Sequence, residues 1–239
     1  MFDSQRAYRQ LVARIENADG SGSLQLLPAI YEIADLLQRN RIIDGMDGSY
    51  KARRYLRRAV YIAQKNEDST PLHLADAHIA LGDYLSVQTV DRRAAFRQYA
   101  AAWEQLSSDP ALADERNARF GTPTLLNDIP SQSSSAMRKL MLLSQDAVDD
   151  YSARLAVRYD IGSDGRTSSV AIIEGDPTGY WDSIVENYVD NLVFRPGIVD
   201  GQAAEYTDLV YEVHYSYRDQ ELPADLRQNE PGRSFSFDQ

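Results

Sequence analysis

Apolar residues recur with the period of an α-helix over the first 106 residues of the chain. The spacing of one helical face predicts helices over 25–39, 51–64, 74–87 and 92–106. Residues suited to N-caps precede three of these helices, at Ser23, Ser49 and Asp91. The stretch 40–48 is interpreted as a long loop. Four helices joined by turns predict stacked antiparallel pairs.

The pattern changes to a period of two after residue 152. Alternation predicts a strand over 155–161, a turn at Gly162–Gly165, a returning strand over 170–173 and a last strand over 206–217. The turn holds Asp164 and Gly165, which tolerate a positive φ. A helix is expected over 180–193, with Trp181, Ile184, Val185, Tyr188 and Leu192 on its buried side.

Turn-forming residues separate the two patterns. Proline, glycine and serine cluster between 107 and 135, and a short helix is expected between 137 and 148. The predicted fold class is α+β, with all-α hairpins followed by a β-β-α-β domain. The expected division is a helical domain at 5–120, a linker with a connecting helix at 121–150, the β-β-α-β domain at 151–218 and a polar tail at 219–239.

Charge narrows the choice of partners. The net charge is −11, and from Tyr151 onward we count 16 acidic against 7 basic residues. This imbalance argues against nucleic acid as a partner and favours a neutral or basic peptide. There is no cysteine, which excludes disulfides and thiolate sites. No apolar run is long enough to span a membrane, and the polar start does not resemble a secretory signal. The chain is therefore expected to be cytoplasmic, or to follow a segment that has been removed.

Catalytic chemistry finds no support in the sequence. Nucleophile-elbow, P-loop, dinucleotide-binding and zinc-protease motifs are absent. His73 and His78 are five residues apart and thus on different sides of a helix, so no metal site is predicted. No cofactor is expected. The basic run formed by Lys51, Arg53, Arg54, Arg57 and Arg58 could hold an acidic peptide or a phosphate, but a solvated helix face is the favoured interpretation.

The helices at 74–87 and 92–106 resemble a tetratricopeptide repeat. Leu81-Gly82 matches the large–glycine step of its first helix, and Ala95, Tyr99 and Ala102 match the small–aromatic–small ladder of its second. Gly82 and Ala95 would admit a closely packed helix. Ala52, Leu56 and Ala59 repeat the ladder 43 positions earlier, against the usual ~34. A generic helical bundle stays open as an alternative.

Six features follow one another in the segment 152–217. Ala156–Ile161 and Ser163–Arg166 make up the expected first hairpin, and Val170–Glu174 the second strand. Tyr180-Trp-Asp182 and Phe194-Arg-Pro196 stand at the two ends of the expected helix, and Gly201 precedes the last strand. In these features the segment resembles the C-terminal domain of TonB-family proteins. The chain departs from the family's energy transducers, since it has no membrane span, no proline-rich spacer and no Tyr-Pro element before the first strand.

The resemblance implies a non-enzymatic periplasmic protein that binds partner proteins, with a role in TonB-dependent transport. An outer-membrane receptor or another envelope component would add a strand to the last strand of the sheet. The matching residues are Asp208, Val210, Glu212, His214 and Ser216. The tetratricopeptide resemblance implies a second peptide site in a helical groove, at Asp76, Ile79, Asp83 and Ser86. Two alternatives stay open for the edge strand: it mediates homodimerisation in a structural or assembly component, or the tail 218–239 covers it.

Overall fold

The computed structural model describes residues 2–39, 41–88, 92–126, 151–176 and 182–217. The chain divides into two compact units. One contains residues 1–126 together with 195–204, and the other contains 127–194 and 205–239. The segment 195–204 therefore belongs to the helical unit, although the expected division placed it in the β-β-α-β domain.

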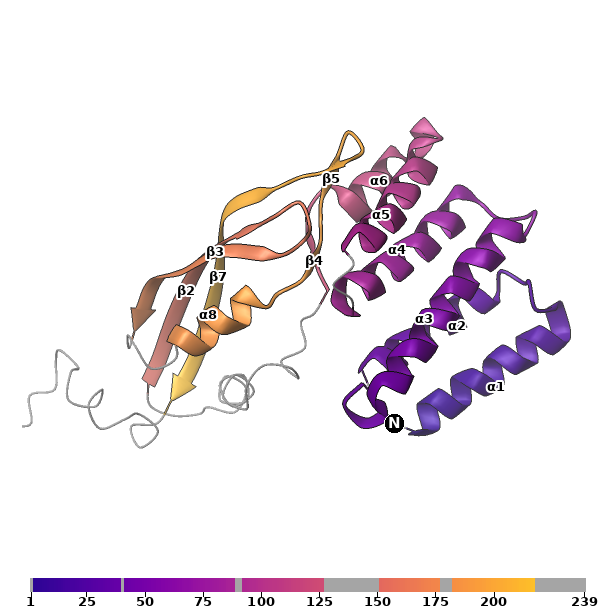
Figure 1. Ribbon diagram of the computed structural model, residues 1–239, viewed down its shortest axis with the longest axis horizontal. Coiled ribbons are helices and arrows are strands. Elements are labelled where there is room, and N and C mark those ends of the chain that lie inside the picture. Colours follow the sequence, from indigo (N-terminus) through magenta and orange to yellow (C-terminus); the bar gives the residue numbers. More distant parts are fainter. Residues whose placement is uncertain (1, 40, 89–91, 127–150, 177–181, 218–239) are drawn as a thin grey trace, which may run out of the picture. The chain divides into compact units, whose positions relative to one another are not determined.

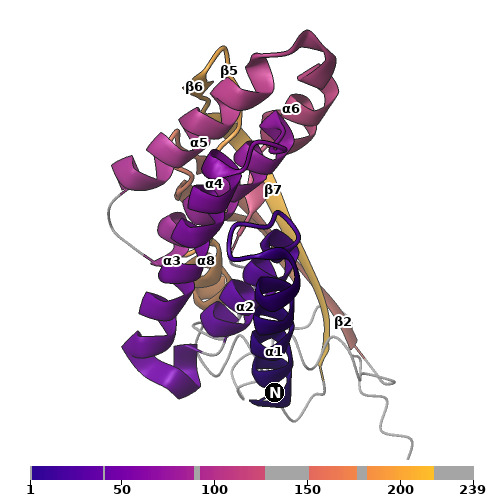
Figure 2. The same cartoon turned by 90° about the vertical axis from the view of Figure 1, so that its right-hand side faces the viewer.

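Successive helices pack side by side in the helical unit (Figures 1 and 2). They are α1 (Phe2–Asp19), α2 (Leu26–Arg39), α3 (Arg41–Lys65), α4 (Pro71–Gln88), α5 (Arg92–Ser107) and α6 (Ala113–Phe120), with a 3-10 turn, η1 (Pro110–Leu112), before α6. The four helices predicted from periodicity are confirmed. The Ser23 hydroxyl accepts a hydrogen bond from the Gln25 amide at 3.2 Å, next to the start of α2.

Two expectations for this unit are wrong. The stretch 41–48 is the first part of α3 and not a loop, so Ser49 lies inside a helix and is no N-cap. Gly45 and Gly48 each cost only about 1 kcal/mol in a helix interior relative to alanine, so they do not prevent a helix here. Helix α6 was missed, because its eight residues include few apolar ones. Asp91 and the helix expected between 137 and 148 lie outside the described residues.

The close approach predicted at Gly82 is present. A Cβ atom at this position would lie 2.5 Å from Cε1 of Tyr99, which is closer than real Cβ contacts. Tyr99 is buried on α5, and its ring meets the buried ring of Phe120 edge-on, with centroids 6.3 Å apart. Gly82 thus lets α4 and α5 pack against each other around a buried tyrosine.

The strand unit contains an antiparallel sheet of order β3-β2-β7. Its strands are β2 (Tyr151–Ile161), β3 (Thr167–Asp176) and β7 (Tyr206–Tyr217), and α8 (Asp182–Asp190) packs against β3 and β2 (Figure 1). The predicted α+β class is confirmed at this level, as are the three strands. The expected start of the helix at Tyr180 and Trp181 lies outside the described residues.

One face of the sheet forms the core of this unit. Leu155, Val157, Tyr159 and Ile161 of β2 are buried, as are Val185, Tyr188 and Val189 of α8. The turn between β2 and β3 closes through a hydrogen bond from the Gly162 amide to the Arg166 carbonyl and another from the Gly165 amide to the Gly162 carbonyl, each 2.8 Å long. Gly165 has the positive φ expected of it. The Thr167 hydroxyl donates to the carbonyl of Val189 at 2.8 Å and so satisfies one acceptor at the end of α8.

Candidate functional site

Strand β7 lies at an edge of the three-stranded sheet. It pairs with β2 on one side, and no other strand of the described chain pairs with it. An edge strand presents a row of backbone N–H and C=O groups to its surroundings, and such a row can pair with an added strand. The sheet of the strand unit therefore offers a template for backbone hydrogen bonding along β7.

Most of β7 pairs with β2 in a regular register. From Leu209 to Tyr217, every residue pairs in turn with β2 without a shift of register. The opposite edge strand, β3, shifts register twice against β2. Because bulges twist an edge and hinder pairing with another chain, β7 is the better template of the two edges.

The regular part of β7 begins after a bulge. Thr207 and Asp208 both stand opposite Asp160, and Asp208 has a φ of 57°. The Asp208 amide donates a hydrogen bond of 3.0 Å to the Asp160 carboxylate. This bond, with one from the Ser169 hydroxyl, holds the pKa of Asp160 below its usual value. Asp160 thus fixes the point from which β7 runs straight.

Side chains on β7 alternate between two faces. Tyr211 packs its ring against Tyr188 of α8, with centroids 5.7 Å apart. On the other face, Val210 is 48% exposed, and Glu212 accepts a hydrogen bond of 2.8 Å from Arg154 of β2. The predicted residues Asp208, Val210 and Glu212 are all exposed.

Two more of the predicted edge residues have a described backbone only. His214 and Ser216 stand opposite Arg154 and Ser152 of β2. Their side chains lie outside the described part of the chain. All five predicted residues are therefore on β7, and three of them have exposed side chains.

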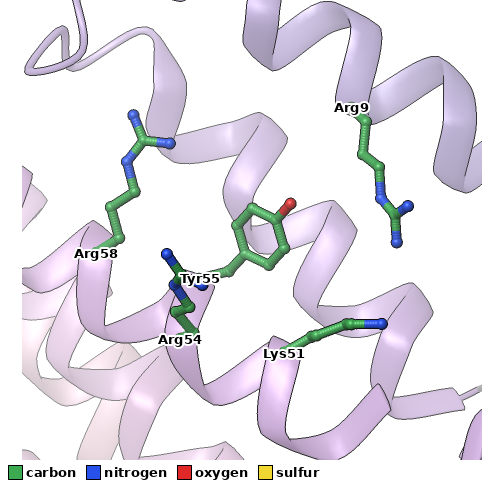
Figure 3. A pocket seen from close by; sticks show the side chains of 5 residues that line it. All are labelled: Arg9, Lys51, Arg54, Tyr55 and Arg58. Atoms are coloured by element: carbon green, nitrogen blue, oxygen red, sulfur yellow. The ribbon is translucent and has the colours of Figure 1, made fainter. Parts of the chain in front are cut away.

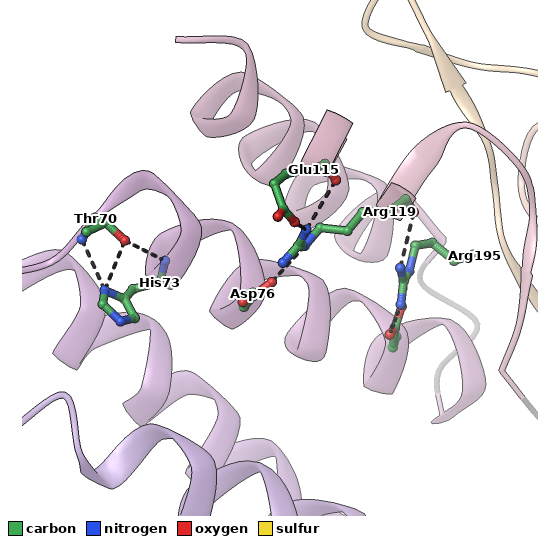
Figure 4. A network of polar contacts seen from close by, with 7 residues as sticks. Thr70, His73, Asp76, Glu115, Arg119 and Arg195 are labelled. Atoms are coloured by element: carbon green, nitrogen blue, oxygen red, sulfur yellow. Dashed lines mark hydrogen bonds and ion pairs between the residues drawn. The ribbon is translucent and has the colours of Figure 1, made fainter. Parts of the chain in front are cut away.

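The residues predicted for a helical groove have other roles. Ile79 and Ser86 are buried, so they do not line a peptide site and this part of the prediction is wrong. Asp76 accepts a hydrogen bond of 2.9 Å from Arg119 of α6, which also pairs with Glu115 (Figure 4). The buried positions follow from close packing of α4 on α5, which periodicity alone did not reveal.

Asp83 is held by an arginine from far along the chain. The Arg195 guanidinium contacts both carboxylate oxygens of Asp83, at 3.0 and 2.7 Å, and donates to the carbonyl of Arg119 at 3.2 Å (Figure 4). Burial would lower the pKa of Arg195, but hydrogen bonding to Asp83 and its negative charge raise it, so the guanidinium stays charged. Tyr99 donates to the same carboxylate at 3.0 Å.

The segment around Arg195 completes the helical unit. Strand β5 (Ile198–Val199) pairs with β6 (Gln202–Ala203), and Ile198 is part of the helical core with 2% exposure. Asp200 and Gly201 form the turn with φ of 51° and 79°. A Cβ on Gly201 would lie 3.6 Å from Nε1 of Trp103. Asp-Gly is a two-residue hairpin signal, and it could have revealed this hairpin from the sequence.

No protein-family model and no curated protein sequence matches this chain. The likeness to TonB-family domains and to tetratricopeptide repeats therefore stays a prediction drawn from the residues. Among the described residues, no helix is both long and apolar enough to cross a membrane, and no group of three or more histidine or acidic side chains is arranged to hold a metal ion.

Proposed function

We propose that this protein is a non-enzymatic binding protein that captures an extended segment of a partner protein as an additional strand on β7. The observation that carries the proposal is the nine-residue regular stretch Leu209–Tyr217 at the edge of the sheet. Backbone hydrogen bonds along such an edge supply affinity, and alternate side chains supply specificity.

The chemistry around β7 favours a basic or neutral partner. Asp208 is an exposed carboxylate at this edge, and Val210 offers an apolar contact next to it. The carboxylate of Glu212 is also exposed but is paired with Arg154. A partner segment with an apolar residue flanked by lysine, arginine or polar residues would complement this pattern. The excess of acidic residues after Tyr151 points the same way.

The resemblance to TonB-family domains supports a cellular location and a class of partner for this binding activity. It favours an envelope protein in the periplasm whose partner is an outer-membrane receptor or another envelope component, with a role in TonB-dependent transport. The helical groove is not part of this proposal. Its two carboxylates bind arginines of the same chain, Asp76 to Arg119 and Asp83 to Arg195. The proposed function therefore rests on β7 alone.

A second function, homodimerisation through β7, uses the same edge. Antiparallel pairing of two β7 strands about a two-fold axis would be self-complementary. The excess of acidic over basic residues from Tyr151 onward would also make two copies of this unit repel each other. This repulsion is the reason to prefer a partner peptide over a second copy.

A library of extended peptides screened against the full chain tests the proposal. We expect the bound sequences to alternate apolar with basic or polar residues, and bound peptide to slow hydrogen exchange in Leu209–Tyr217 but not in β3. Val210→Pro should abolish binding, because proline removes an N–H and distorts an edge strand. Ile173→Pro on β3, also at an exposed position, is the matched control and should keep binding.

Two results would count against strand addition to a partner. Slowed exchange confined to any other part of the chain would place the peptide site elsewhere. A mass in light scattering of twice 26.9 kDa, returned to one chain by Val210→Pro, would favour the dimer instead.

A further inference from the structure

Positive charge is concentrated on one helix of this acidic protein. Six of the 25 basic residues lie within the last 15 residues of α3, between Lys51 and Lys65, and this stretch has no aspartate or glutamate. The chain as a whole carries a net charge of −11. The sequence analysis favoured a solvated helix face for this run. In the structure, part of this face lies next to α1.

Part of this basic run lines a pocket of about 620 Å³ (Figure 3). Lys51, Arg54, Tyr55 and Arg58 come from α3 with the spacing i, i+3, i+4 and i+7, which places them along one side of the helix. Arg9 of α1 lines the pocket from across. Arg9 was not predicted, because nothing in the local sequence of α1 links it to α3.

The pocket gathers four cations. Arg58 forms an ion pair with Glu16 of α1 and donates to the Ser21 carbonyl, which anchors that side of the pocket. Within the described chain, Arg9 and Arg54 have no ion-pair partner. Like charges at this spacing repel one another, so an anion that enters the pocket would be stabilised by relieving that repulsion.

The arrangement of the side chains suggests the form of the anion. In Figure 3, Tyr55 lies between Arg9 and Lys51 on one side and Arg54 and Arg58 on the other. Arg9 and Arg54 are the two cations of the pocket without an ion-pair partner in the described chain, so the pocket suits a ligand of at least two negative charges. Guanidinium groups bind phosphate through paired hydrogen bonds, and a pocket of several hundred Å³ has room for an organic group as well.

We propose that this pocket binds a small molecule that carries a diphosphate or two phosphate groups. Arg9 and Arg54 contact the phosphate oxygens, and Tyr55 packs against the organic part. The site is independent of β7 and does not rest on the strand-addition function.

Calorimetric titration of the full chain in 150 mM salt tests the proposal with three probes: inorganic pyrophosphate, inorganic phosphate and citrate. We expect pyrophosphate to bind at least tenfold more tightly than either of the other two. Arg9→Gln and Arg54→Gln should each weaken pyrophosphate binding at least fivefold. Arg57→Gln is the matched control, since Arg57 is an exposed cation of the same helix and does not line the pocket.

Four outcomes would overturn the proposal. Absence of pyrophosphate binding removes it directly. An equal loss in Arg57→Gln would show a diffuse charge effect and no defined site. Citrate binding as tightly as pyrophosphate would refute the phosphate class, and a poly-glutamate peptide that displaces pyrophosphate at lower concentration would point to an acidic protein partner. Circular dichroism of each variant establishes that it is folded, so that lost binding reports on the pocket.

Discussion

Replacing Arg195 with methionine tests whether the segment 195–204 stabilises the helical unit. Arg195→Met keeps an unbranched apolar side chain close to the size of the arginine stem and removes the guanidinium. The substitution breaks the two contacts with Asp83 and the hydrogen bond to the Arg119 carbonyl. Asp83 would keep its hydrogen bond from Tyr99.

The expected loss of stability can be worked out from how deeply the Arg195–Asp83 ion pair is buried. The side chains of Arg195 and Asp83 are 13% and 25% exposed, so the pair is largely but not wholly removed from water. Breaking a fully buried pair from one side costs about 3–5 kcal/mol. Because Asp83 keeps one hydrogen bond and some contact with solvent, we expect the free energy of unfolding to fall by about 2–4 kcal/mol.

Urea unfolding followed by circular dichroism at 222 nm measures this change, because helices dominate the signal. The midpoint should fall by about 1–2 M with little change in slope. Arg57→Met, at an exposed position of α3, is the control and should stay within about 0.5 kcal/mol of the original protein. If Arg195→Met matches this control, the ion pair does not hold the segment and the reasoning fails. A double substitution with Asp83→Asn should show a coupling of about 1–3 kcal/mol.

Further predictions concern the helical unit. Ile198→Ala should cost about 2–4 kcal/mol in urea unfolding, since Ile198 is 2% exposed in the core, whereas Val199→Ala, at 55% exposure, should cost little. Gly82→Ala should lower the thermal midpoint, because about 1–3 kcal/mol of overpacking against Tyr99 outweighs a gain of about 1 kcal/mol in helix propensity. Burial, followed by the charge of Asp83, raises the pKa of Tyr99 well above 10.0. The corresponding stability is fully present below the pKa of about 10 for unfolded tyrosine and is lost as the pH rises towards the folded value. Tyr99→Phe should therefore show a weaker loss of stability between pH 10 and 11 than the original protein, and an equal loss would contradict the assignment.

The local pattern of polar and apolar residues was sufficient to predict most of the secondary structure. The last strand was predicted with its observed limits, because polar and apolar residues alternate along most of it. The helical face of α2 was equally clear. At 41–48 the predicted loop was wrong, since the effect of Gly45 and Gly48 on a helix is small enough for the neighbouring turns to outweigh.

The pattern of polar and apolar residues could not predict contacts between residues far apart in the sequence. Asp83 lies 112 residues from Arg195, and no local signal relates the two. Arg9 and Arg54 line the same pocket only because α1 and α3 are brought together by folding. On β7, by contrast, exposed positions follow from alternation alone, so Asp208, Val210 and Glu212 could be identified from the sequence.

The segment 195–204 constrains when the helical unit can complete its folding during synthesis. During synthesis, the helices up to α6 leave the ribosome well before Arg195 and Ile198 do. All of β2, β3 and α8 must therefore emerge before the core of the helical unit is complete. A fragment ended at Leu126 would lack this buried isoleucine and would leave Asp83 without its arginine. Cutting the chain at the apparent boundary would therefore yield a weakened N-terminal piece, open to proteolysis, and not an autonomous domain.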